Sequence, residues 1–215
     1  KNHAIVMPDA DMDNAVAQLL GAAFGSSGER CMALSVAVAV GDAAADQLVS
    51  KMKEAMKTLK IGPCHDADND FGPVITKQHQ QKVFGYIDSA EEQGADIVVD
   101  GRNPTIDGYE NGFYVGGTLI DRVTADMDSY DAEIFGPVLQ VVRVDSMQQA
   151  MDLIDAHEYG NGTCIFTRDG EAARYFSDHI QVGMVGINIP LPVPVAYHSF
   201  GGWKRSLFGD LHAYG

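Results

Sequence analysis

The hydrophobic positions of the first sixty residues alternate between two spacings. Positions 4–7 form a short apolar run, which predicts a strand. The apolar residues that follow repeat with helical spacing, so we expect a helix from Pro8 to about Gly25. The unbroken apolar run 34–40 predicts a buried strand, and positions 48–59 return to helical spacing. This part of the chain therefore has the pattern strand, helix, strand, helix.

After a polar, acidic stretch at 64–70, the alternation continues as far as position 187. The expected elements are helices at 77–93, 147–156 and 171–178, and extended segments at 97–99, 113–120, 138–144, 163–166 and 182–187. Strands that alternate with helices form crossover units. The pattern therefore predicts the α/β class, with a mostly parallel sheet flanked by helices on both faces. Beyond Asn188 the proline-rich sequence is typical of loops.

Composition supports a single folded domain over 1–215. Residues of the hydrophobic class make up 46% of the chain and charged residues 21%, which excludes a disordered or collagen-like chain. No apolar run approaches the length that crosses a bilayer. With 15 basic and 30 acidic residues, the net charge of -15 repels nucleic acids and anionic membranes. We therefore expect neither nucleic acid nor membrane as a partner.

Three widely spaced cysteines in a chain of this size indicate a reducing compartment. The expected location is the bacterial cytoplasm, or the mitochondrial matrix in a eukaryote. The chain begins with Lys1 and shows no signal peptide, so we expect it to be part of a longer protein. Positions 64–66 read Cys-His-Asp, but neighbouring side chains on an extended segment point apart. No metal site is expected there.

Cys31 is the candidate nucleophile. It directly follows Arg30, whose fixed positive charge favours the reactive thiolate over the thiol. It also lies between a predicted helix and a buried strand, a junction at which α/β folds expose functional groups. Charge context alone is weak evidence, because an isolated cysteine is more often an inert buried residue.

Several further motifs occur in a fixed order along almost the whole chain, and together with Cys31 they resemble the motif series of the aldehyde dehydrogenase superfamily. The motifs are residues 24–33, 62–63 with 71–75, 112–114, 133–138, 159–160, 183–188 and 200–204. Independent motifs in the right order are far more specific than any single pattern. The resemblance implies the catalytic domain of such an enzyme, with NAD as its cofactor.

The resemblance also assigns roles to individual residues. It makes Cys31 the nucleophile that adds to an aldehyde and passes through a thiohemiacetal to a thioester. Glu133 matches the carboxylate that binds the nicotinamide ribose, and Phe135 the ring beside the nicotinamide. Phe200 matches an aromatic residue of the substrate tunnel, although a core role fits it nearly as well. Asn188 is expected to order its own loop.

Residues 1–3, Arg30 and the stretch 190–210 are most similar to the coenzyme-A-acylating branch of the superfamily. That branch converts methylmalonate or malonate semialdehyde to propanoyl- or acetyl-coenzyme A with loss of carbon dioxide. Coenzyme A is then the acyl acceptor, and Arg30 binds the substrate carboxylate. Relatives usually have Gln where this chain has Glu29, whose carboxylate would disfavour the thiolate or pair with Arg30.

The chain contains no Gly-x-Gly-x-x-Gly motif. The resemblance implies that the cofactor-binding domain and an oligomerisation strand lie outside 1–215, that the full-length protein is a homo-oligomer, and that this part alone is inactive. Two alternatives stay open. One is a hydrolytic semialdehyde dehydrogenase that releases a free acid, and the other is a non-catalytic scaffold module.

Overall fold

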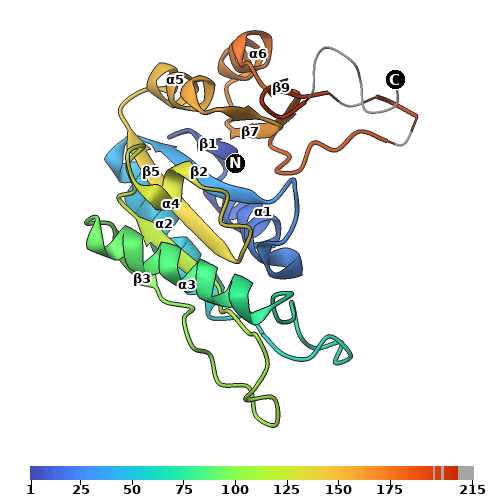
Figure 1. Cartoon of the computed structure of the whole chain (residues 1–215). Coiled ribbons are helices and arrows are strands. Elements are labelled where there is room, and N and C mark those ends of the chain that lie inside the picture. Colours follow the sequence, from blue (N-terminus) through green and yellow to red (C-terminus); the bar gives the residue numbers. More distant parts are fainter. Residues whose placement is uncertain (196, 200, 208–215) are drawn as a thin grey trace.

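The computed structural model describes residues 1–195, 197–199 and 201–207 of the chain. Its centre is a seven-stranded sheet with the order β3-β4-β5-β2-β1-β7-β8 (Figure 1). All neighbouring strands are parallel except β3, which pairs antiparallel with β4 at one edge. The strands are β1 (Asn2–Val6), β2 (Leu34–Val40), β3 (Asp96–Val99), β4 (Thr118–Asp121), β5 (Val138–Val144), β7 (Gly162–Phe166) and β8 (Met184–Ile187).

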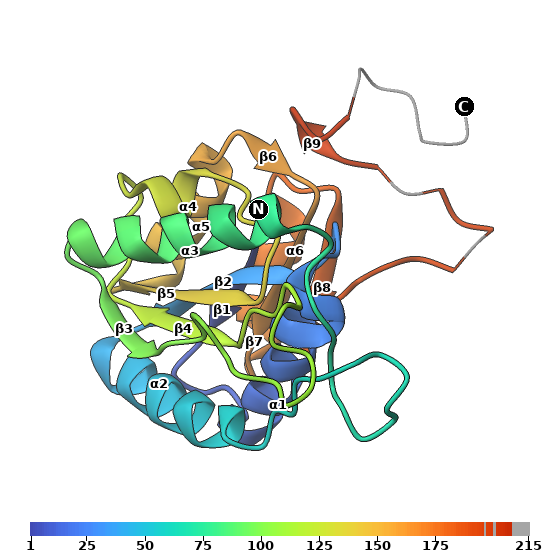
Figure 2. The ribbon, with the colours of Figure 1, turned by 60° about the horizontal axis from the view of Figure 1, so that its bottom comes forward.

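Helices cover both faces of the sheet, so the predicted fold class is confirmed. Figure 2 shows α1 and α2 on one face and α3 with α5 on the other. The helices are α1 (Met12–Phe24), α2 (Asp42–Met56), α3 (Lys77–Glu92), α4 (Asp128–Asp131), α5 (Met147–Ala156) and α6 (Gly170–His179), with a 3-10 turn η1 (Gly25–Gly28) after α1.

The two faces of the sheet carry different side chains, because alternate residues of a strand point to opposite sides. Ala4, Ala37 and Ala39 pack against the helices α1 and α2, and their small size lets these helices approach closely. Ile5 and Val38 lie on the other face, in the core shared with α3, α5 and α6. All five of these side chains are fully buried.

Four of the helices begin at a polar residue whose side chain accepts a hydrogen bond from a backbone N–H of the first turn. These N-caps are Asp11, Thr76, Ser146 and Asp169. Such caps satisfy donors that have no partner within the helix, each contributing about 1 kcal/mol. They explain why α3 and α5 begin at the predicted residues.

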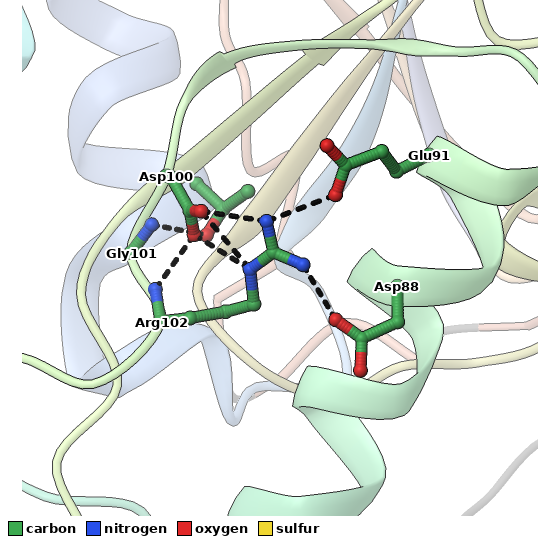
Figure 3. Close-up of polar contacts among 6 residues, drawn as sticks. Asp88, Glu91, Asp100, Gly101 and Arg102 are labelled. Carbon is green, nitrogen blue, oxygen red and sulfur yellow. Dashed lines mark hydrogen bonds and ion pairs between the residues drawn. The ribbon is translucent and has the colours of Figure 1, made fainter.

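Arg102 ties α3 to the loop that follows β3 (Figure 3). Its guanidinium pairs with Asp88 and Glu91 of α3 and with Asp100, at N–O distances of 2.5, 3.0 and 2.6 Å. The Arg102 side chain is mostly buried, whereas its three partners are about half exposed. The cluster therefore holds the end of β3, which is the edge strand of the sheet, next to α3.

Some elements were not predicted from the sequence. The short helix α4 has no hydrophobic period, and the two-residue strands β6 (Tyr159–Gly160) and β9 (Trp203–Lys204) pair only with each other. The described residues between β8 and β9 lie outside the sheet and the helices that cover it (Figures 1 and 2). None of the helices in the described ranges combines the length and apolar character needed to cross a membrane.

Candidate active site

A cavity of about 470 Å³ lies at one edge of the sheet. Lys1, Cys31, Asn161 and Met184 line it. Each stands at or just before the first residue of β1, β2, β7 or β8, which are neighbours in the sheet. The cavity therefore opens at the amino-terminal edge of the parallel strands, opposite to the edge at which open α/β sheets usually bind ligands.

Cys31 is exposed in a turn that leads into β2. The turn is closed by a hydrogen bond of 3.1 Å from the Ala33 N–H to the Arg30 carbonyl. Within the described residues, no hydrogen bond uses the Cys31 N–H. The residue that carries the thiol is therefore exposed, and its N–H is not committed to another acceptor among the described residues. Cys64 is also exposed but does not line the cavity, and burial strongly raises the pKa of the Cys164 thiol.

The backbone before Cys31 has an uncommon conformation. Ser26, Ser27 and Gly28 all have positive φ, at 53°, 57° and 68°. A Cβ on Gly28 would lie 2.2 Å from the Gly136 carbonyl oxygen, so only glycine permits this approach. Strained backbone of this kind is concentrated at functional sites. Here it brings the loop that carries Cys31 against the loop that carries Glu133.

Glu133 lines the same cavity as Cys31. Phe135, with 37% of its surface exposed, lines a small second cavity together with these two residues. Phe135 has a φ of 59°, which is rare for a bulky residue. Its carbonyl oxygen lies 2.6 Å from Nε2 of His79, and the same nitrogen lies 3.5 Å from Oε1 of Glu29. His79 thus joins the Phe135 loop to the Cys31 loop.

Lys1 is buried behind Glu133, and its ammonium donates to the carbonyl oxygens of Ser129 and Ala132 at 2.8 and 2.7 Å. Burial lowers the pKa of Lys1 to about 7, while the Glu133 and Asp131 carboxylates act to raise it. Lys1, which directly precedes β1, therefore holds in place the segment that leads into Glu133.

The structure excludes one of the two alternatives for Glu29, pairing with Arg30, and limits which Arg30 atoms can reach a substrate. Arg30 donates from Nε to the Gly25 carbonyl at 3.0 Å and from Nη2 to the Gly21 carbonyl at 3.1 Å, at the C-terminal end of α1. Glu29 does not pair with Arg30. It faces His79 instead and accepts a hydrogen bond from the Ile75 N–H at 3.3 Å. Arg30 lines a small secondary cavity beside Cys31 and is not among the described residues that line the main cavity.

A buried aromatic cluster lies beside the cavity. Nε2 of His3 lies 2.9 Å from the Tyr130 hydroxyl, and the ring of His157 meets both rings edge-on. Nδ1 of His157 accepts from the Tyr159 N–H, while its Nε2 has no partner among the described residues. Burial lowers the pKa of His157 to about 4 and that of His3 well below its usual value. Both rings are therefore neutral at pH 7.

The other sequence expectations have separate outcomes. Phe200 lies outside the described residues. Asn188 orders its loop as expected, because its carboxamide exchanges two hydrogen bonds of 3.0 Å with the Thr167 backbone. Within the described ranges, no group of three histidine, cysteine or carboxylate side chains is arranged to hold a metal ion. Cys64 and His65 are both exposed.

The sequence analysis assigned no structural role to four residues at the site, which are Lys1, Asn2, His79 and Asn161. Each acts through backbone groups far away in the sequence, so no local spacing could reveal it. The signals that existed were the motif at residues 1–3 and the position of Asn161, two residues before the predicted strand at 163–166.

Comparison with known proteins places the chain among enzymes. A family model described as "Aldehyde dehydrogenase family" matches residues 1–214. A malonate-semialdehyde dehydrogenase of Pseudomonas aeruginosa is 67% identical over 100% of this chain and 43% of its own length. The crystal structure of a methylmalonate-semialdehyde dehydrogenase from Oceanimonas doudoroffii matches with a TM-score of 0.98 and 84% identity, over 100% of this chain and 44% of that one.

A putative methylmalonate-semialdehyde dehydrogenase from Sinorhizobium meliloti, solved in complex with NAD, is 57% identical, with a TM-score of 0.97, over 99% of this chain and 43% of that one. The chain thus spans less than half the length of these relatives.

Proposed function

Because the chain belongs to the aldehyde dehydrogenase family, we propose that it is the thiol-bearing catalytic domain of an NAD-dependent semialdehyde dehydrogenase. The proposed substrates are methylmalonate and malonate semialdehyde, in line with the names of its relatives. The observation that carries the proposal is that the exposed Cys31 and the carboxylate residue Glu133 line one cavity.

Cys31 is the proposed nucleophile. Its thiolate adds to the aldehyde carbon, so that a C–S bond forms while the carbonyl π electrons move to oxygen. The developing oxyanion needs hydrogen-bond donors. The Cys31 N–H can serve as one of them, since no hydrogen bond within the described residues uses it. Oxidation of this thiohemiacetal then leaves an acyl thioester on Cys31.

Glu133 and Phe135 are the residues that would hold the cofactor. A carboxylate suits the vicinal hydroxyls of a ribose, and an exposed aromatic ring suits a flat nicotinamide. These residues fit the nicotinamide-ribose end of the dinucleotide. When bound, NAD supplies the acceptor for the hydride that leaves the substrate carbon. Lys1 would hold the Glu133 segment in place for this task through the Ser129 and Ala132 carbonyls.

Arg30 is proposed to meet the substrate carboxylate through Nη1, because Nε and Nη2 are already engaged at the end of α1. Arg205 lines the main cavity and is a second cation for an anionic substrate, although it also pairs with Glu158. In a chain of net charge -15, an anionic substrate needs such local cations.

Coenzyme A is the proposed acyl acceptor. The bond between the α-carbon and the substrate carboxylate breaks to release carbon dioxide, and the electron pair left on the α-carbon takes up a proton from solvent. The coenzyme A thiolate attacks the thioester carbonyl and displaces the Cys31 thiolate, so that propanoyl- or acetyl-coenzyme A is the product. The whole protein is proposed to be a homo-oligomer, with its cofactor-binding domain outside residues 1–215.

The proposal is tested with the whole protein that contains this chain, by the absorbance of reduced NAD during incubation with malonate semialdehyde. Turnover that requires coenzyme A supports the acylating reaction, and turnover that yields free acid without coenzyme A supports a hydrolytic enzyme. Full turnover by the Cys31→Ala variant would contradict the role of the thiol, and no turnover with any aldehyde would favour a scaffold module.

A further inference from the structure

Two side-chain amides meet at the carbonyl oxygen of Cys31. Nδ2 of Asn2 lies 2.8 Å from this oxygen, and Nδ2 of Asn161 lies 3.1 Å from it. A carbonyl oxygen has two lone pairs, so these two donors fill its hydrogen-bonding capacity. The peptide group between Cys31 and Met32 is therefore held by two side chains, even though Cys31 itself is exposed.

Both amides are attached to the sheet. Asn2 is the first residue of β1, and Asn161 directly precedes β7, the neighbour of β1. Asn2 also accepts a hydrogen bond of 3.0 Å from the Gly162 N–H at the start of β7. The Cys31 carbonyl is thereby fixed to the amino-terminal ends of two adjacent strands.

We propose that Asn161 and Asn2 are positioning residues for Cys31, and that their hydrogen bonds to its carbonyl hold the turn that presents the thiol and the Cys31 N–H to the cavity. The Cys31 carbonyl, N–H and side chain share one Cα. Holding the carbonyl therefore leaves few orientations for the other two groups. The effect on turnover rests on the proposed function, whereas the effect on the turn itself does not.

Asn161 is the better residue to test. Asn2 is buried and also serves Gly162, so its loss would disturb the sheet itself. Asn161 is partly exposed, and within the described ranges its amide donates to the Cys31 carbonyl and, at 3.3 Å, to Sδ of Met32 alone. Asn161→Asp keeps the shape but removes both N–H groups, and Asn161→Ala removes the side chain.

Asn111 provides matched controls. It is exposed in a turn that does not line the cavity, and its side chain makes no hydrogen bond in the described part of the chain. Asn111→Asp introduces the same charge change as Asn161→Asp, and Asn111→Ala makes the same truncation. A difference between the Asn161 variants and the Asn111 variants therefore reflects the lost contact with Cys31 and not the change in net charge.

The first measurement is amide hydrogen exchange in the whole protein, which needs no activity. The amide of interest is Ala33, whose N–H closes the turn onto the Arg30 carbonyl. We expect both Asn161 variants to speed exchange at residues 30–33 by about tenfold or more, because the turn opens more often. The Asn111 variants should match the wild type. Unchanged exchange in both Asn161 variants would overturn the positioning role, even if the wild type oxidises semialdehydes.

The second measurement is steady-state kinetics. Misplaced catalytic groups cost up to about a hundredfold in rate, so we expect kcat to fall by about tenfold to a hundredfold, with KM for the aldehyde changed by less than about threefold. Raised KM with unchanged kcat would instead make Asn161 a substrate contact and overturn the proposal. If the wild type oxidises no aldehyde, the proposed function fails, and hydrogen exchange still decides whether Asn161 holds the turn.

Discussion

Cys31 and Glu133 line one cavity, although they belong to loops that precede two different strands, β2 and β5. The two loops meet because Gly28 lies against the backbone of Gly136, and because His79 contacts both of them. Cys31, the proposed nucleophile, and Glu133, the proposed ribose ligand, are thus held at one cavity by contacts between their loops. The chemistry proposed for the site depends on this contact between loops.

The first prediction concerns the reactivity of the three cysteines. Iodoacetamide should label Cys31 faster than Cys64, and Cys164 only after unfolding. Cys164 is fully buried, which raises the pKa of its thiol and blocks the reagent. Peptide mass spectrometry of the folded protein at short reaction times measures the order. Preferential labelling of Cys64 would contradict the assignment of Cys31 as the nucleophile.

The second prediction is that Gly28→Ala damages both stability and activity. The left-handed backbone alone costs a residue with a Cβ about 1–2 kcal/mol, and the Cβ would also meet the Gly136 carbonyl oxygen at 2.2 Å. Urea unfolding should therefore show a lower free energy of unfolding, and activity should fall because the two loops separate. Gly108→Ala is the control, since Gly108 also has positive φ but open space around it. Equal activity loss in both variants would argue against the loop contact.

The strands and helices could be largely predicted because they obey local rules. The run 34–40 is β2, and the helical spacing at 147–156 is α5, with the same bounds as predicted. The short helix α4 and the paired strands β6 and β9 were missed, since two to four residues show no period. Their positions depend on tertiary contacts instead, such as the hydrogen bonds from Lys1 to the Ser129 and Ala132 carbonyls.

The candidate site was only partly predictable, because tertiary contacts decide which of its residues meet. The motifs drew attention to Cys31 and Glu133, which the structure brings to one cavity. The direction of the Arg30 side chain could not be inferred, because the free carbonyls at the end of α1 become its partners only in the folded chain. Nor could the sequence indicate that Asn161 reaches the Cys31 carbonyl, since their proximity depends on the order of β1, β2 and β7 in the sheet.

The third prediction concerns the cofactor. Glu133→Gln removes a charged hydrogen-bond acceptor, and hydrogen bonds to charged groups contribute about 1.5–3 kcal/mol. We therefore expect kcat/KM for NAD to fall by about tenfold to a hundredfold in the whole protein. The same change should lower the Lys1 pKa further, because the Glu133 carboxylate acts to raise it. The control is Asp145→Asn, because Asp145 is exposed and does not line the cavity. An unchanged kcat/KM for NAD in Glu133→Gln would contradict the proposed role of Glu133 in binding the cofactor.

The fourth prediction is a loss of stability in mild acid. The folded chain keeps His157 neutral down to about pH 4, whereas an unfolded histidine takes up its proton near pH 6.5. The unfolded state therefore binds more protons in this window, and the free energy of unfolding falls as the pH drops from 6.5 to 4. The slope is about 1.4 kcal/mol per pH unit for each such histidine. His3 adds in the same direction.

Urea unfolding at several pH values measures this slope. His157→Gln should reduce it, whereas His65→Gln, at an exposed histidine, should leave it unchanged. An equal slope in the wild type and the His157 variant would show that other groups cause the acid sensitivity.

The central claim is that Cys31 carries the acyl group as a thioester. The most direct test is to trap this acyl group on the protein. The whole protein is incubated with NAD and malonate or methylmalonate semialdehyde in the absence of coenzyme A, quenched in acid and digested, and its peptides are weighed by mass spectrometry. The account predicts an acyl adduct on the peptide that contains Cys31, which disappears when coenzyme A is added. Reduction of NAD through many turnovers with Cys31 unmodified, or an adduct on Cys64 instead, would contradict it.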